Sequence, residues 1–313
     1  MKVAVVFPGQ GSQYPGMGRK AFEVYPAARE VFSAADAVLG FPLSRLCFEG
    51  PEEELTKTAN AQPAILTVSV ALWRVLQEKG VRPFACAGHS LGEYSALVAA
   101  GALRFADALL LVRKRGEYMQ EAVPQGKGGM VAVLGLETAA VENICREVTE
   151  KGAFCAVANY NCPGQVVIAG ETEALNEATA LAREAGAKRC IPLAVSAPFH
   201  CRLMLPAAER LAVDLARTNV AEPKVPVVAN VTADYVNSGE EIRRLLEKQI
   251  FSPVLWEQCV LRLIRDGAGM FLEVGPGSVL AGLIKKIDRR VPVFSVEDPE
   301  SLEKVLARCL EVS

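Results

Sequence analysis

One segment of the sequence combines a candidate nucleophile with the backbone geometry that would activate it. Gly88-His89-Ser90-Leu91-Gly92 follows a short apolar run and precedes a helical pattern, which is the strand–turn–helix setting of a nucleophile elbow. So sharp a turn strains the serine backbone, requires flanking glycines and lifts the hydroxyl out of the sheet. The N–H of Leu91 would open the helix and can stabilise an oxyanion. We therefore expect Ser90 to act as a nucleophile.

A serine nucleophile needs a base, and the sequence contains only two histidines. His89 adjoins Ser90, and neighbouring side chains diverge on a tight turn, so His89 is a poor proton acceptor for its neighbour. His200 is the remaining candidate general base. The competing interpretation of His200 is a hydrogen-bonded structural histidine.

A carboxylate that would complete a hydrolase triad is hard to find. The order in α/β-hydrolases is serine, acid, histidine, and the only aspartate between Ser90 and His200 is Asp107, in a predicted helix. No glutamate stands in a loop shortly before His200, and a long segment follows it. A serine–histidine pair oriented by a backbone carbonyl fits better, which weakens a serine esterase or thioesterase as the alternative. A non-catalytic binding module is the second alternative.

The turn after the first predicted strand, Phe7-Pro8-Gly9-Gln10-Gly11-Ser12-Gln13, resembles a phosphate loop only superficially. Tyr14 occupies the place of the third glycine of a dinucleotide-binding loop, and no Lys-Ser/Thr pair follows as in a P-loop. Two interpretations remain. The segment is a plain strand-end turn, or it brings a second backbone N–H, that of Gln10, to the oxyanion.

The elements that must position these residues follow an α/β pattern. Short β-branched runs alternate with longer helical patterns, which predicts a largely parallel sheet. We expect strands at 2–7, 84–87, 225–230, 270–274 and 291–295, and helices near 62–79, 91–100 and 105–121.

A linker-like stretch, 124–129, introduces a separate series of elements. The pattern predicts a strand at 130–134, a helix at 138–151, strands at 154–158 and 165–169 joined by the turn Asn161-Cys162-Pro163-Gly164, a helix at 172–185 and a strand at 188–191. This βαββαβ order is that of a ferredoxin-like unit. We expect 125–195 to be a small domain inserted into a larger one made of 1–124 and 196–313.

The composition argues against several classes of function. A net charge of −2 gives no bulk attraction to nucleic acid or membranes. No apolar run approaches the roughly 20 residues of a membrane span, and the N-terminal run ends at Pro8-Gly9, as a strand does rather than a signal peptide. Nine scattered cysteines without C-x-x-C spacing predict a reducing, cytoplasmic setting. Neither histidine has a ligand-spaced cysteine, so no metal site is expected.

Together these segments resemble the malonyl-CoA:acyl carrier protein transacylases and, more distantly, the acyltransferase domains of fatty-acid and polyketide synthases. The resemblance covers essentially the whole chain, and it implies an α/β-hydrolase-like large domain with a ferredoxin-like insertion. Its marks, in chain order, are 7–13, 88–93, Arg115-Gly116-Glu117-Tyr118-Met119-Gln120, 159–165, Pro198-Phe199-His200, Gln249 with Pro253-Val254-Leu255-Trp256, and Glu273-Val274-Gly275-Pro276-Gly277.

The resemblance implies an activity and its partners. A malonyl group passes from malonyl-CoA to the pantetheine thiol of acyl carrier protein through an ester on Ser90. The coenzyme A thioester is a substrate, and no cofactor is expected. His200 is implied as the base, with the backbone carbonyl of Gln249 orienting its imidazole, and the amides of Leu91 and Gln10 as oxyanion donors.

The resemblance also implies a substrate pocket that contains Arg115, Met119, Asn161 and Phe199. Without it, Arg115 would be interpreted as part of a solvated basic helix face. A guanidinium binds a carboxylate in a two-pronged geometry that lysine cannot reproduce, and an acetyl group would leave it unpaired. Phe199 resembles the malonyl-selective form of the motif, because it would fill the space that a methylmalonyl methyl needs.

The acyl carrier protein is expected to be small and acidic, so its docking surface should be locally basic. Two clusters qualify, Lys188-Arg189 and Lys285-Lys286 with Arg289-Arg290. The alternative is that both are ordinary solvated faces. The chain length without flanking linkers predicts a free-standing enzyme of fatty-acid synthesis.

Overall fold

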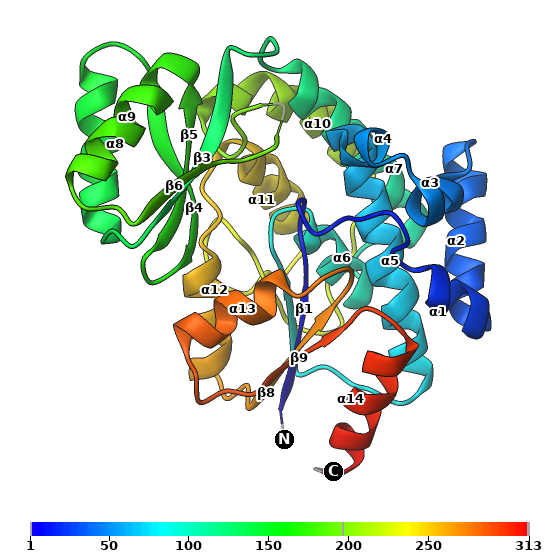
Figure 1. Cartoon of the computed structure of the whole chain (residues 1–313). Helices are drawn as coiled ribbons and strands as arrows, with labels where there is room; N and C mark the ends of the chain where they lie inside the picture. The colour runs from blue at the N-terminus through cyan, green and yellow to red at the C-terminus, as the bar shows by residue number, and fades with distance from the viewer. Residues whose placement is uncertain (1, 196, 312–313) are drawn as a thin grey trace.

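A five-stranded parallel sheet forms the centre of the larger part of the molecule (Figure 1). The computed structural model describes residues 2–195 and 197–311. The strands lie in the order β7-β2-β1-β8-β9, and every neighbouring pair is parallel. The predicted α/β class with a mainly parallel sheet is confirmed. The strands are β1 (Val3–Phe7), β2 (Ala85–Gly88), β7 (Val227–Val228), β8 (Met270–Val274) and β9 (Val293–Val296).

Helices cover both faces of this sheet, as a parallel sheet requires. Along β1, Val5 and Phe7 belong to one apolar cluster, whereas Ala4 and Val6 belong to another. The alternation of side chains along a strand therefore supplies two separate cores. The first core contains residues of α5 (Thr58–Glu78), α6 (Gly92–Ala99) and α7 (Phe105–Glu121), and the second contains residues of α12 (Trp256–Arg265) and α13 (Val279–Ile287).

Helix α5 starts earlier than predicted and includes Pro63. Proline has no N–H, so the carbonyl of Ala59 lacks its helical donor. The Nη1 of Arg113, on α7, donates to that oxygen at 3.0 Å. The two helices approach closely because Gly116 has no side chain: a Cβ there would lie 2.7 Å from the Cα of Ala59. The basic stretch of α7 is thus partly a packing surface rather than a wholly solvated face.

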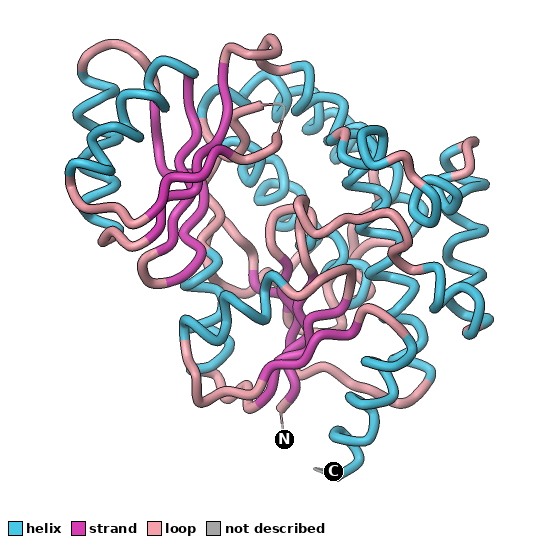
Figure 2. The backbone as a smooth tube through the Cα atoms, in the orientation of Figure 1, coloured by secondary structure: helices cyan, strands magenta, loops and turns pink. Residues whose placement is uncertain are grey.

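A second, antiparallel sheet carries two helices of its own (Figure 2). Its strands lie in the order β4-β5-β3-β6. Val131, Ile168 and Ala178 belong to an apolar cluster distinct from those of the parallel sheet. The order strand, helix, strand, strand, helix, strand is as predicted. These elements are β3 (Gly128–Leu134), α8 (Thr138–Glu150), β4 (Cys155–Cys162), β5 (Gln165–Glu171), α9 (Thr172–Glu184) and β6 (Arg189–Pro192).

The turn between β4 and β5 is shorter than predicted. Strand β4 continues through Cys162, which pairs with Gln165, so only Pro163 and Gly164 remain as the turn. Gly164 has φ +70°, a backbone conformation that a tight two-residue turn uses and that glycine adopts without strain. Asn161 therefore belongs to the strand, at a register shift between Tyr160 and Cys162.

Strand β4 also joins the two sheets. Val254 pairs with Asn159 in an isolated parallel bridge. Its N–H donates to the oxygen of Ala158, and its oxygen accepts from the N–H of Tyr160, both at 2.9 Å. The segment before α12 therefore holds the small sheet against the large one.

Prolines mark the starts of two of the strands that are shorter than predicted. The expected strand 225–230 is reduced to Val227–Val228, and the expected strand 291–295 begins only at Val293. Pro226 and Pro292 precede them, and proline cannot donate to a sheet. The remaining helices are α1 (Arg19–Val24), α2 (Pro26–Leu39), α3 (Leu43–Glu49), α4 (Glu52–Thr56), the 3₁₀ turn η1 (Arg202–Met204), α10 (Leu205–Arg217), α11 (Gly239–Phe251) and α14 (Pro299–Glu311).

Within residues 2–195 and 197–311, no helix is both long and apolar enough to cross a bilayer. In the same residues, no cluster of three or more His, Cys, Asp or Glu side chains has the arrangement of a metal site. The eight cysteines whose side chains the structure describes are free thiols. The side chain of Cys309 lies outside the described residues.

Candidate active site

Ser90 stands on the sharp turn between β2 and α6 that the sequence predicts. Its φ is +52°, in the left-handed region that non-glycine residues rarely adopt. A Cβ on Gly88 would lie 1.9 Å from the carbonyl carbon of Gly92, and one on Gly92 would lie 2.0 Å from the oxygen of Phe7. Only glycine fits at either flank. The N–H of Ser90 donates to Oδ1 of Asn230 at 2.7 Å, which holds the strained residue in place.

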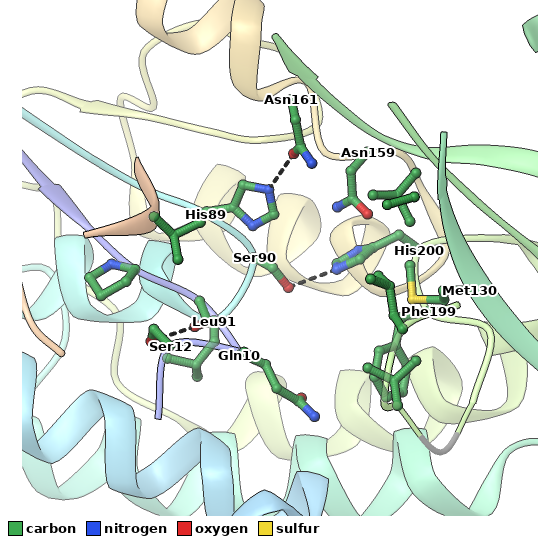
Figure 3. A pocket seen from close by; sticks show the side chains of 18 of the residues that line it. Gln10, Ser12, His89, Ser90, Leu91, Met130, Asn159, Asn161, Phe199 and His200 are labelled. Carbon is green, nitrogen blue, oxygen red and sulfur yellow. Dashed lines mark hydrogen bonds between the residues drawn. The ribbon is translucent and has the colours of Figure 1, made fainter. Parts of the chain in front are cut away.

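His200 meets Ser90 across the pocket (Figure 3). The Ser90 Oγ lies 2.7 Å from the His200 Nε2, and the His200 Nδ1 lies 2.8 Å from the backbone oxygen of Gln249. The carbonyl can only accept, so Nδ1 carries the proton and Nε2 has a free lone pair. Burial, followed by the positive charge of Arg115, lowers the pKa of His200 to about 3. The imidazole is therefore neutral at physiological pH and can accept the serine proton.

A backbone carbonyl, rather than a carboxylate, orients this imidazole. Asp107, the only aspartate that the sequence offered between the pair, forms a surface ion pair with Arg104 at 3.0 Å. The geometry thus agrees with the interpretation that disfavoured a hydrolase triad.

His89 turns away from Ser90, as expected of its neighbour on a tight turn. Its Nε2 lies 2.9 Å from Oδ1 of Asn161, on β4 (Figure 3). Burial lowers the pKa of His89. Asn161 and His89 both line the pocket, so β4 of the small sheet reaches the elbow of the large one through this pair.

The two candidate oxyanion amides come from neighbouring strands. Leu91 follows β2 and Gln10 follows β1, and both line the pocket beside Ser90. The turn that contains Gln10 is held by Oγ of Ser12, which donates to the oxygen of Gly9 at 2.8 Å. The Gln10 side chain extends away from Ser90 (Figure 3). Its Nε2 donates to Oγ1 of Thr58 at 3.2 Å.

Arg115 lies almost completely buried under the nucleophile, with 1% of its surface exposed. Its Nη1 donates to Oε1 of Gln62 at 2.8 Å, and its Nη2 donates to Oε1 of Gln249 at 2.9 Å and to Oγ of Ser90 at 3.1 Å. Burial lowers the pKa of its guanidinium. These direct partners are neutral, which leaves the group able to pair with a carboxylate that enters the pocket.

The pocket has a volume of about 230 Å³ and a largely apolar lining. Met119 from α7 and Phe199 beside the base lie on its wall and are themselves buried. The Sδ of Met119 lies 3.7 Å from Nε2 of Gln62. Further lining comes from the small sheet, from the segment that follows it and from the first half of α13, including Met130, Val167, Val195, Val279, Leu280 and Leu283.

Three polar residues of this site were not found from the sequence as parts of its network: Gln62, Glu93 and Asn230. Glu93 directly follows the glycine-flanked turn, and Asn230 follows the short strand β7. A polar residue just beyond the carboxyl end of a parallel strand is a recognisable signal for a site. Gln62 carries no comparable signal, because it lies inside the long helix α5 and reaches Arg115 only through packing.

The two basic clusters proposed for docking are exposed. Lys285 and Lys286 lie at the end of α13, whose first residues line the pocket. The Nζ of Lys286 donates to Oε1 of Gln165, a pocket residue of β5, at 3.1 Å. Lys188 and Arg189 lie at the start of β6.

Comparisons with known proteins agree on one group of enzymes. The acyl transferase domain family matches residues 4–299. A malonyl CoA-acyl carrier protein transacylase of Bacillus subtilis is 51% identical over 96% of this chain and 95% of its own length. One of Escherichia coli K12 is 48% identical over 97% of this chain and 98% of its own length.

Solved structures give the same result. A malonyl-transacylase structure described as a complex with a type II PKS acyl-carrier protein superposes with a TM-score of 0.96 at 48% identity, covering 98% of this chain and 100% of its own. An acyl carrier protein S-malonyltransferase of Vibrio cholerae has a TM-score of 0.95 at 45% identity, covering 97% of this chain and 100% of its own.

The close packing at the elbow predicts that Gly92→Ala abolishes Ser90 reactivity. The added methyl would meet the Phe7 oxygen at 2.0 Å, so either the turn or β1 must move, and overpacking of this kind costs about 1–3 kcal/mol or more. Labelling by a serine-directed fluorophosphonate should fall at least about a hundred-fold. Gly282→Ala, in the middle of α13 with open space around it, is the control and should leave labelling unchanged. Normal labelling of Gly92→Ala would show that the turn is not tightly constrained.

Proposed function

The chain belongs to the malonyl CoA-acyl carrier protein transacylases, and we propose that it transfers malonyl from coenzyme A to the pantetheine thiol of acyl carrier protein through an ester on Ser90. The observation that carries the proposal is the buried guanidinium of Arg115, 3.1 Å from the Ser90 hydroxyl. A positive charge at that place suits an acyl group that ends in a carboxylate.

In the first half-reaction, Nε2 of His200 takes the proton of Ser90 as Oγ attacks the thioester carbon. The amides of Leu91 and Gln10 stabilise the resulting oxyanion. Collapse of the intermediate breaks the carbon–sulfur bond, and the departing coenzyme A sulfur takes the proton from His200. Malonyl remains on Ser90 as an ester.

In the second half-reaction, the same groups act in reverse. Nε2 of His200 takes the proton of the pantetheine thiol, whose sulfur attacks the ester carbonyl. The carbon–oxygen bond then breaks, and Ser90 recovers the proton from His200. The carbonyl of Gln249 holds the imidazole through both steps. We expect the reaction to need no cofactor, because the malonyl group arrives already activated as a thioester.

Selectivity for malonyl rests on pairing its carboxylate with Arg115. An acetyl group would leave the buried charge with only neutral partners, a penalty of about 1–3 kcal/mol. Met119 and Phe199 fill the pocket around the acyl group, and Phe199 leaves little room for an added methyl. Asn161 contributes by holding His89 at the pocket wall.

We infer that residues 125–195 form a ferredoxin-like domain inserted into an α/β-hydrolase-like domain made of 1–124 and 196–313. The βαββαβ order and the strand order β4-β5-β3-β6 support this division. The boundary residue Ser196 lies outside the described residues. Free thiols at the eight described cysteines support a cytoplasmic location, and malonyl units for fatty-acid synthesis are the proposed product.

Replacing the nucleophile is the primary test. Ser90→Ala should eliminate the covalent malonyl adduct seen by intact mass spectrometry after mixing with malonyl-CoA, and should lower transfer to acyl carrier protein at least about a thousand-fold. A wild-type protein that releases free malonate instead of keeping the adduct would be a thioesterase.

An adduct that persists in Ser90→Ala would point to another nucleophile. Cys201, which directly follows His200 in sequence, is the first candidate, but burial raises the pKa of its thiol to about 11. Such a thiol is a poor nucleophile at neutral pH.

Arg115→Ala should lower malonyl transfer roughly 30- to 1,000-fold, which corresponds to the loss of about 2–4 kcal/mol from a buried charged pair. Acetyl transfer should persist or rise, because the unpaired charge is gone. Arg113→Ala is the matched control: Arg113 supports α5 from the same helix, so its loss should affect both substrates alike. Equal losses with malonyl-CoA and acetyl-CoA in Arg115→Ala would make Arg115 a structural residue.

The basic clusters are proposed to dock the acidic carrier protein. Lys285→Glu with Lys286→Glu should raise the KM for the carrier roughly 3- to 10-fold at low ionic strength, with a smaller effect at high salt. Acylation by malonyl-CoA should change much less. Lys188→Glu with Arg189→Glu tests the second cluster, and Lys79→Glu, at the opposite end of the parallel sheet, is the control. Unchanged carrier kinetics in both double variants would remove both clusters from the docking surface.

A further inference from the structure

Glu93 is a buried carboxylate for which the reaction steps above assign no role. It lies in the first turn of α6, three residues after the nucleophile, and only 3% of its surface is exposed. Burying a carboxylate is unfavourable unless hydrogen bonds compensate. The partners of Glu93 therefore show what its position contributes.

One oxygen of Glu93 holds two residues of the site. Its Oε2 accepts from the side-chain Nε2 of Gln249 at 2.7 Å and from the backbone N–H of Asn230 at 3.0 Å. Asn230 in turn supports the elbow: its Oδ1 accepts from the N–H of Ser90, and its Nδ2 donates to the oxygen of Gly88, both at 2.7 Å. Removal of Glu93 would thus disturb the nucleophile through Asn230.

The contact with Gln249 has a different consequence. A side-chain amide has a donating and an accepting end, and an ionised carboxylate can only accept. Glu93 therefore requires the NH₂ of Gln249 to face it. The backbone oxygen of Ser90, which accepts from the same nitrogen at 3.1 Å, favours the same orientation. The amide oxygen must then point the other way, and there it accepts from Nη2 of Arg115 at 2.9 Å.

The groups around Glu93 determine whether its carboxylate is ionised, as the orientation of the Gln249 amide requires. Burial raises its pKa to about 7, while the hydrogen bonds from Asn230 and Gln249 and the charge of Arg115 lower it. The other titratable groups that interact with it are Tyr94 and Cys259, whose pKa values burial raises, so both are neutral near pH 8. Arg115 is the only charged group among these neighbours. At that pH the carboxylate is mostly ionised.

We propose that Glu93 is a positioning residue for malonyl recognition: it orients the Gln249 side-chain amide, which in turn holds Arg115 at the place where the malonyl carboxylate must sit. This proposal rests on the proposed function. Gln249 thereby has two separate tasks, since its backbone oxygen orients His200 and its side chain aligns Arg115. A guanidinium out of place would still attract the carboxylate but would set the thioester carbon at the wrong angle to Ser90.

The charge of Glu93 acts in the opposite direction on binding. A negative group near Arg115 repels the malonyl carboxylate, so its removal favours malonyl-CoA binding. The two effects therefore change different kinetic quantities: positioning changes the acylation rate, and repulsion changes KM. Loss of Glu93 should lower the acylation rate at saturating malonyl-CoA while KM stays equal or falls. Acetyl-CoA has no carboxylate to pair with Arg115, so it reports the effects on Ser90 that both substrates share, whether they pass through Asn230, Gln249 or Arg115.

The experiment measures the single-turnover acylation of Ser90 at about pH 8, with malonyl-CoA and with acetyl-CoA, and takes the ratio of the two saturating rates. In Glu93→Met, which has no acceptor, the ratio should fall about ten-fold. In Glu93→Gln, which keeps one acceptor oxygen, it should fall about three-fold.

Gln249→Met, which keeps the backbone oxygen for His200, should lower the ratio as much as Glu93→Met does, and the double variant should lower it no further. In an Arg115→Ala background, Glu93→Met should leave the ratio unchanged.

Several outcomes would overturn the proposal. If both rates fall equally in Glu93→Met, Glu93 supports only the elbow. A higher KM for malonyl-CoA with an unchanged rate would also contradict it. If Glu93→Met does not fold, an unchanged ratio in Glu93→Gln decides against it. Asp36→Asn, which removes a hydrogen-bonded carboxylate in the distant helix α2, should leave the ratio unchanged. Absence of any malonyl adduct in the wild-type protein would instead contradict the proposed function.

Discussion

The burial of one positive charge beside the nucleophile constrains the rest of the site. Removing a guanidinium from water is unfavourable by several kcal/mol unless hydrogen bonds and nearby charges compensate. Arg115 receives this compensation from the amide oxygens of Gln62 and Gln249 and from the face of Tyr94, whose ring centre lies 5.6 Å from its Cζ. Glu93 does not contact Arg115 directly: its carboxylate accepts from the Gln249 amide, and the oxygen of that amide accepts from Arg115. None of these groups is a carboxylate in direct contact with Arg115, so its guanidinium remains available to pair with a carboxylate that enters the pocket.

The same charge bears on which group can orient the imidazole of His200. Burial, and after it the positive charge of Arg115, lowers the pKa of His200 and keeps the ring neutral, ready to accept a proton. A carboxylate on Nδ1 would raise that pKa and would compete with an entering carboxylate for Arg115. The backbone oxygen of Gln249 orients the ring without adding a charge. A serine–histidine pair without an acid is therefore suited to a site that must recognise an anion.

The site also depends on how the two sheets meet. The loops after β1 and β2 meet at the carboxyl edge of the parallel sheet, where ligands bind in open α/β folds. Strand β4 closes the other side, because Val254 pairs with it and Asn161 reaches His89. The pocket walls therefore come from both sheets, and the apolar residues of α13 complete them.

Local patterns predicted most of the elements and the serine and histidine that the structure brings together. The elbow depends on glycines two residues to either side of the serine, which a short segment displays. The composition of the chain, with only two histidines, left one candidate base. The sequence pattern also predicted the parallel sheet and the βαββαβ order. The roles of Arg115 and Gln249 came from resemblance to a family, since a basic helix face and a helical glutamine carry no local signal of a site.

Only the tertiary structure decided which polar groups meet beneath the nucleophile. Gln62 and Arg115 are 53 residues apart in sequence, and Glu93 and Gln249 are 156 apart. Such contacts follow from helix packing, including the close approach of α5 and α7 at Gly116, rather than from the local sequence. A hydrogen bond also depends on atomic distance and direction, which the spacing of residues does not specify. The motifs of the chain therefore display the candidate nucleophile and base, while the network around the guanidinium exists only once the helices have packed.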